Sequence, residues 1–147
     1  MQLVKWCAAS ALALAVVLSP AQAPAVDIPV FLGDVGVGNH TADVRSQLRS
    51  MLNAELSKTD FAQVKTHDHY LLSATLVRLD SVVAAESVRA TCVVSVAILR
   101  DNGATLHAVV RGRATAEESK AHAEAARSEA LRAAVHSAIT RVPQALR

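Results

Sequence analysis

The sequence has few cysteines, few glycines and prolines, and little net charge. Its 147 residues include two Cys, five Gly and four Pro, which excludes a disulfide-dense scaffold, a collagen-like repeat and a low-complexity chain. Fifteen Lys and Arg oppose thirteen Asp and Glu, for a formal net charge of +2. A protein that binds the phosphates of nucleic acid needs a larger excess of cations. Because 52% of the residues are apolar, composition predicts one folded domain that binds no nucleic acid.

The first 25 residues have the three-part pattern of a secretory signal peptide. One positive charge lies within Met1–Lys5, an apolar run extends over Trp6–Leu18, and small residues with a proline follow in Ser19–Ala25. The apolar run is shorter than the roughly 20 residues that a transmembrane helix needs. The pattern therefore predicts an exported protein with a cleaved leader.

The cleavage site is open between three positions, after Ala21, Ala23 or Ala25. Cleavage leaves a single domain over residues 26–147 with no integral membrane segment. A lipid-modified cysteine follows the apolar run, whereas Cys7 precedes most of it. We therefore expect no lipid anchor at this cysteine.

The first part of this domain predicts a strand, a loop and a helix. Residues 27–32 form an apolar, β-prone run, and residues 33–40 contain three glycines, which predicts a loop. From Thr41 an amphipathic helix of about sixteen residues is indicated, since apolar residues recur at three- and four-residue steps. These apolar positions are Val44, Leu48, Met51, Leu52 and Leu56.

A run of four strands and a final helix is predicted next. The strands are expected over 61–65, 71–79, 88–99 and 105–112, with a polar insert over 80–87 and an Asn102-Gly103 pair that suits a two-residue hairpin. Thr115–Glu118 reads as a capping box, which predicts that the last helix begins there and ends at Pro143. The resulting order, β-α-β-β-β-β-α, predicts an α+β fold: a mostly antiparallel sheet of four to five strands with two helices on one face.

Six segments share a pattern of core positions with a known group of domains. They are Leu48–Leu56, Phe61–Val64, Tyr70–Ala74, Val88–Arg100, Leu106–Ala114 and Ala130–Val135. In this pattern the chain resembles the small periplasmic α/β domains of bacterial envelope proteins, such as LpoB, CsgG and the amino-terminal domain of TolB. The resemblance spans nearly all of residues 26–147 and implies a non-enzymatic adaptor or assembly domain. The chain lacks the lipobox, membrane-spanning strands and propeller of these proteins, so neither pore formation nor a defined partner carries over.

The most metal-like cluster is His67-Asp68-His69. On a strand, residues two apart share a face, so His67 and His69 are the candidate metal ligands. Two ligands fall short of the three or four of a zinc site, and His40, His107 or His122 would have to supply the rest. A solvated turn is the alternative interpretation.

Other candidates for chemistry are weaker. Cys92 alternates into an apolar strand face, so we expect a buried, inert thiol rather than a nucleophile. The glycines of Gly33–Gly38 lack the lysine and spacing of a phosphate-binding loop. Arg111 and Arg113 share one face of a strand and are the candidate residues for binding an acidic partner, with a plain solvated face as the alternative.

These observations predict an exported, periplasmic or secreted, interaction or assembly protein without catalytic activity or cofactor. Its expected partner is a protein of the cell envelope, with a homo-oligomer as a further expectation. The alternative function is a small exported ligand- or metal-binding protein that uses His67 and His69.

Overall fold

A computed structural model describes residues 30–64, 68–100 and 103–147 of the chain. The expected leader, His67 and Asn102 lie outside these described residues. The elements follow in the order β1 (Val30–Gly36), α1 (Ala42–Lys58), β2 (Tyr70–Val83), β3 (Ser87–Arg100), β4 (Thr105–Ser119), a 3-10 turn η1 (Lys120–His122), α2 (Ala123–Ile139) and α3 (Val142–Ala145). The predicted α+β fold is confirmed.

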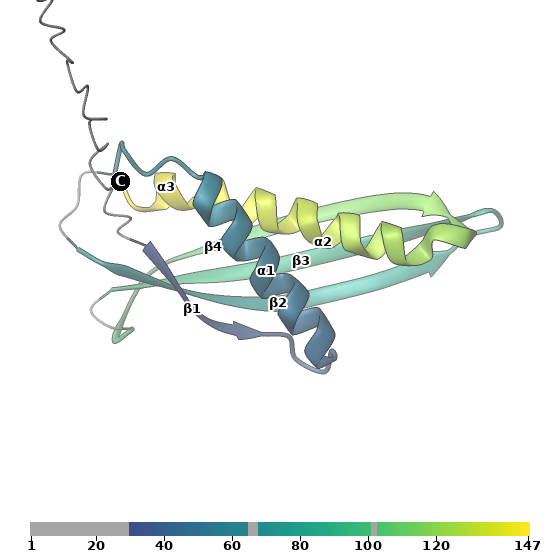
Figure 1. The fold of residues 1–147 in the computed structure, drawn as a ribbon, viewed down its shortest axis with the longest axis horizontal. Coiled ribbons are helices and arrows are strands. Elements are labelled where there is room, and N and C mark those ends of the chain that lie inside the picture. Colours follow the sequence, from purple (N-terminus) through teal and green to yellow (C-terminus); the bar gives the residue numbers. More distant parts are fainter. Residues whose placement is uncertain (1–29, 65–67, 101–102) are drawn as a thin grey trace, which may run out of the picture.

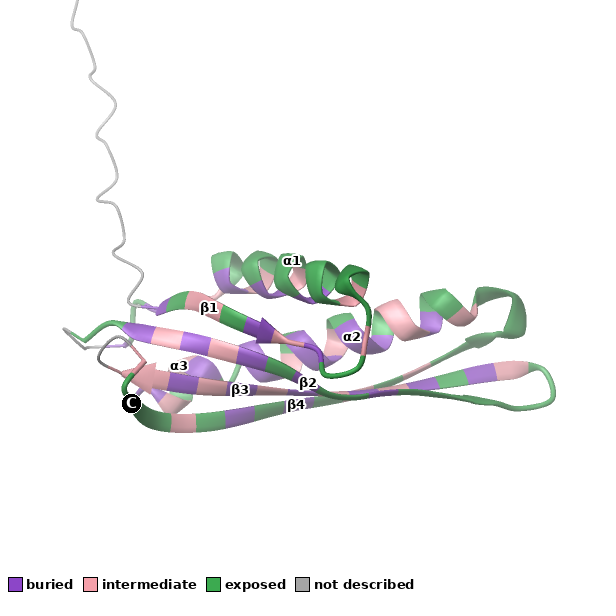
Figure 2. Ribbon diagram, turned by 90° about the horizontal axis from the view of Figure 1, so that it is seen from below, coloured by how far each residue is buried: buried purple, intermediate pink, exposed green. Residues whose placement is uncertain are grey.

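One four-stranded sheet carries the fold, with the strands in the order β1-β2-β3-β4. β1 runs parallel to β2, and the other neighbours are antiparallel. Both long helices lie on the same face: α1 packs over β1, and α2 packs over β3 and β4 (Figure 1). Among the described residues, no helix or strand covers the opposite face, as Figure 2 shows in side view. Within the described part of the chain, no helix is both long and apolar enough to cross a membrane.

The core lies between the sheet and the helices and follows the predicted periodicity. On β3 every second residue from Val88 to Ile98 is buried, and on α1 the buried residues Leu48, Leu52 and Leu56 recur every four residues. Alanines form much of the surface by which α2 packs on the sheet: Ala126, Ala130, Ala134 and Ala138 are all fully buried.

Small residues bring α2 unusually close to the sheet. A Cβ atom built on Gly112 of β4 would lie 1.9 Å from the carbonyl oxygen of Ala134 and 2.7 Å from the amide nitrogen of Ala138. Only a residue without a side chain fits below the helix at this point. The alanine stripe and this glycine therefore form one close backbone contact.

The capping-box interpretation of Thr115–Glu118 is wrong, because these residues continue β4 and α2 begins at Ala123. Local propensity favours a helix there, but the segment pairs with residues 88–91 of β3. The pair adds cross-strand contacts, among them a 2.9 Å ion pair between Arg89 and Glu117. Such long-range pairing outweighs a local capping signal.

The strand expected over 61–65 is also absent from its described part, residues 61–64. The carbonyl of Phe61 accepts a 2.9 Å hydrogen bond from the amide of Val64, which makes a turn. Both side chains are buried in the core, so their spacing of three reflects a turn rather than a strand.

Two loops are shorter than expected and one is longer. Only Ala84–Glu86 reverses the chain within the predicted 80–87 insert, and β1 continues through Gly33 as far as Gly36. Gly38, with φ of +55°, makes the turn into α1. Between β3 and β4, Arg100 pairs with Thr105, so four residues connect the strands rather than two.

Candidate functional site: the open face of the sheet

The uncovered face of the sheet, here called the open face, presents the side chains that alternate with the core. It has an apolar end near the β3–β4 connection. There Phe31, Leu106 and Val109 are 53%, 58% and 50% exposed. Leu71 and Leu99, paired across β2 and β3, lie between them and are partly exposed. Exposed apolar side chains grouped in this way are typical of contact surfaces.

The two candidate arginines lie in the middle of the open face. Arg111 pairs with Ser95 and Arg113 with Val93 in the β3–β4 register. Both side chains are exposed, and within the described residues neither forms an ion pair with a carboxylate. The expected shared face is confirmed, and it carries two uncompensated positive charges.

At the opposite end of the open face, the charged side chains pair with one another. Arg89 donates to Glu117 at 2.9 Å, and Ser87 donates to the same carboxylate at 2.7 Å. The hydrogen bonds from Ser87 and Arg89 lower the pKa of Glu117 below its usual value. Within β2, Arg78 forms an ion pair with Asp80, two residues further along the same strand. Among the described residues of β3 and β4 on this face, Arg111 and Arg113 are therefore the charged side chains without an ion pair.

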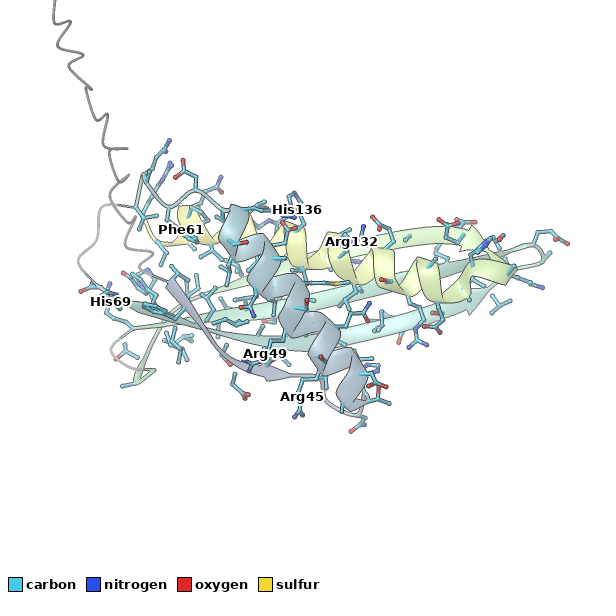
Figure 3. The ribbon with its side chains drawn as sticks, viewed as in Figure 1. Arg45, Arg49, Phe61, His69, Arg132 and His136 are labelled. Atoms are coloured by element: carbon cyan, nitrogen blue, oxygen red, sulfur yellow. The ribbon has the colours of Figure 1, made fainter. Side chains whose placement is uncertain are left out.

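The metal candidates are not joined into a site by the described structure. His69 is exposed, and its ring lies 5.9 Å from that of Phe31; Figure 3 shows it at the end of the sheet, before β2. Asp68 pairs with Arg100 at 3.4 Å. Among the described residues, no three His, Cys, Asp or Glu side chains gather as metal ligands do. Since His67 lies outside those residues, its pairing with His69 stays a prediction.

Cys92 is fully buried on the covered face, as expected. Burial in apolar surroundings raises the pKa of its thiol to about 12. The thiolate form needed for nucleophilic attack is therefore scarce at neutral pH.

A groove of about 560 Å³ lies between the first turns of α1 and α2. Val44 and Leu131 form its apolar sides over Leu79 of β2, and Asp43 and Arg127 belong to its polar rim. Arg127 is 3.6 Å from Glu124 of the same helix. Sequence reasoning missed this groove because its residues come from three separate elements.

A second missed feature joins the two long helices. The Nδ1 atom of His136 on α2 lies 2.9 Å from a carboxylate oxygen of Glu55 on α1, and Figure 3 shows His136 facing α1. This hydrogen bond, together with nearby Lys58, lowers the pKa of Glu55. The partners are 81 residues apart, so no local pattern marks them.

No family model and no curated protein matches this sequence. Among solved structures, the chain is similar to the hypothetical protein CT253 from Chlamydia trachomatis, with a TM-score of 0.57 and 10% identity over 80% of this chain and 96% of that one. The minor lipoprotein from Acinetobacter baumannii gives a TM-score of 0.46 and 13% identity, over 77% of this chain and 91% of that chain. The likeness to CT253 shows a shared fold, and neither likeness assigns a function.

Proposed function

We propose that this protein is an exported, non-catalytic interaction protein of the bacterial envelope, which binds an acidic segment of a partner protein on its open face. The leader pattern of the first 25 residues supports export. The observation that carries the binding role is the pair of exposed arginines, Arg111 and Arg113, without carboxylate partners among the described residues. They lie beside the apolar end of the same face.

The chemistry of this face suits a protein segment with acidic residues. Exposed guanidinium groups bind carboxylates in bidentate geometry. The neighbouring apolar side chains Val109 and Leu106 offer area that a peptide side chain can cover. A surface that combines apolar anchors with arginine is typical of protein interfaces.

A binding role without catalysis also agrees with the state of the nucleophiles. Cys92 is buried with a raised pKa. One hydroxyl of the open face, that of Ser119, lies 2.9 Å from the Nδ1 atom of His122. Both residues are exposed, and among the described residues no carboxylate is hydrogen-bonded to that imidazole to orient it as a general base. The proposal therefore assigns the face to recognition.

The test is site-specific photo-crosslinking in the native envelope. A photoreactive residue replaces Thr75 or Ser95, which pair in the middle of the open face, and in a control replaces Asn53 on the exposed side of α1. We expect one crosslinked protein from both open-face positions, through an acidic segment, and none from Asn53. Arg111→Glu should reduce this crosslink at least tenfold while the fold is retained.

Three results would contradict the proposal. One is equal crosslinking from Asn53, and another is a crosslink that Arg111→Glu leaves unchanged. The third is a crosslinked product that contains only copies of this chain. Absence of any crosslink would favour ligand binding in the groove between α1 and α2 instead.

A further inference from the structure

The two edges of the sheet differ in how they are protected. β1 is a short edge of seven residues with a register shift between Leu32 and Val35. Arg49 of α1 donates a 3.0 Å hydrogen bond to the carbonyl of Gly33, so α1 also reaches this edge (Figure 3). Short length, irregular pairing and a covering side chain are features that block further strand pairing.

β4 is an edge of fifteen residues without lysine or proline. Its register with β3 is regular from Ala108 to Ser119. The described residues cover the first part of this edge: Arg141 donates a 2.9 Å hydrogen bond to the carbonyl of Arg111, and His107 contacts the carbonyl of Ala145. Apart from the residues of β3, no described residue hydrogen-bonds to the backbone of residues 113–117. A regular, uncovered edge of this kind is a template for another strand.

The charges along this edge are self-complementary. In an antiparallel pair of two β4 strands centred on Thr115, Arg113 of each copy lies opposite Glu117 of the other, and both side chains point to the open face. Thr115 meets its own copy on the twofold axis. On the covered face, Ala114 and Ala116 lie opposite each other and leave room for close approach. Opposite charges and paired threonines are favourable cross-strand neighbours.

We propose that β4 pairs with the β4 strand of a second copy in this register, so that two copies form one continuous eight-stranded sheet. If Arg113 or Glu117 lay on the twofold axis instead, it would face the same residue of the other copy, so two like charges would be opposite each other. Centring it on Ala114 would place Arg111 opposite Glu117, but Arg141 already occupies the carbonyl of Arg111. The register centred on Thr115 places no like charges opposite each other, and its ion pairs use Arg113 rather than Arg111.

This pairing engages Arg113 of the surface proposed to bind a partner and leaves Arg111 exposed for that partner. Twofold pairing within a sheet uses backbone groups at the edge and leaves both open faces on the same side of the joined sheet. The dimer would therefore present two copies of Arg111 to a partner. The two proposals share Arg113, but the partner is tested through Arg111 and the dimer through Thr115 and Glu117, so either can fail alone.

Cysteine crosslinking tests the register directly. Thr115→Cys places two thiols on the twofold axis, where opposite Cα atoms lie about 4.5–5.5 Å apart, within the range of a disulfide. Thr91→Cys is the matched control, because its hydroxyl lies 3.3 Å from that of Thr115 on the same face, but on the inner strand β3. Because Cys92 is buried, we expect it to form no disulfide in either variant.

With the purified exported protein under mild oxidation, Thr115→Cys should form a disulfide dimer at least tenfold faster than Thr91→Cys. Sedimentation should show the unmodified protein as a dimer at micromolar concentration. Equal oxidation rates, or a monomer throughout the concentration range, would overturn the proposal. Crosslinking from Thr75 or Ser95 to an envelope partner would be unaffected by that failure.

Charge reversal tests the pairing without a new thiol. Arg113→Glu and Glu117→Arg should each weaken the dimer at least tenfold, and the double variant should return to within threefold of the unmodified protein. Because Glu117 also binds Arg89 within its own chain, thermal unfolding of each variant checks that the fold is intact. A double variant no better than the single ones contradicts the register.

Discussion

β4 presents two different surfaces to its surroundings. On the covered face, Gly112 meets the backbone of α2 with no room for a side chain. On the open face, the neighbouring residues Arg111 and Arg113 extend into solvent. The same strand is thus constrained by packing on one side and free of it on the other. Substitutions on the covered face should therefore destabilise the fold more than those on the open face, because packing limits the volume of a side chain whereas solvent does not.

The largest effect should come from adding one methyl group at the closest contact. In Gly112→Ala, the new Cβ would lie 1.9 Å from the carbonyl oxygen of Ala134, so the helix must move away from the sheet. Such overpacking costs about 3 kcal/mol or more of the free energy of unfolding. Urea unfolding followed by circular dichroism measures the loss.

Gly36→Ala is the matched control for this substitution. Its Cβ would lie 3.6 Å from the nearest atom, the hydroxyl of Thr75, which is an ordinary contact. We expect a change within about 0.5 kcal/mol in either direction, since alanine also restricts the unfolded chain. Equal changes in the free energy of unfolding for the two variants would contradict the close contact between Gly112 and α2.

A smaller effect should separate two adjacent valines of β3. Val94 is fully buried opposite Gly112, whereas Val93 lies opposite Arg113 on the open face and is partly exposed. Val94→Ala should lower the free energy of unfolding by about 2 kcal/mol, because it removes two methyl groups and leaves a cavity. Val93→Ala should cost roughly 0.5 kcal/mol, since solvent fills the space. Equal losses from the two variants would mean that the faces do not differ in packing.

Much of the difference between the covered and the open face can be predicted from the sequence. The two-residue alternation of Cys92, Val94, Val96 and Ile98 predicts the buried face of β3, and the four-residue recurrence of leucines predicts the buried stripe of α1. Arg111 and Arg113 were assigned to a common face by the same period. Burial imposes its periodicity on the residues themselves, which makes it visible without coordinates.

The errors fall where a distant segment decides the local structure. Thr115–Glu118 has the signal of a helix start but becomes strand because β3 extends alongside it. The turn at Phe61–Val64 buries two apolar residues that also suit a strand. Gly112 carries no local sign of its role, since the contact depends on how α2 returns over β4. Tertiary pairing of this kind overrides short-range propensity.

The smallest effect should come from the link between the helices on the covered side. Glu55 is only 15% exposed and accepts a 2.9 Å hydrogen bond from His136. That bond is the main cause of the lowered pKa of Glu55, and Lys58 adds to it. A carboxylate with a folded-state pKa below its unfolded value of 4.5 stabilises the fold above that pH, and the contribution is lost as the pH falls through the folded-state pKa.

Glu55→Gln should therefore lower stability at pH 6 and reduce the loss of stability on acidification below pH about 4.5. The effect at pH 6 should stay below about 1 kcal/mol, because solvent reaches the imidazole of His136 and screens the pair. Unfolding measured from pH 3 to pH 7 gives both quantities. A double-mutant cycle with His136→Ala isolates the pair: Glu55→Gln should have little further effect once the imidazole is gone. If its effect persists unchanged in the His136→Ala background, Glu55 stabilises the fold through Lys58 instead, and the contact between α1 and α2 is apolar in origin.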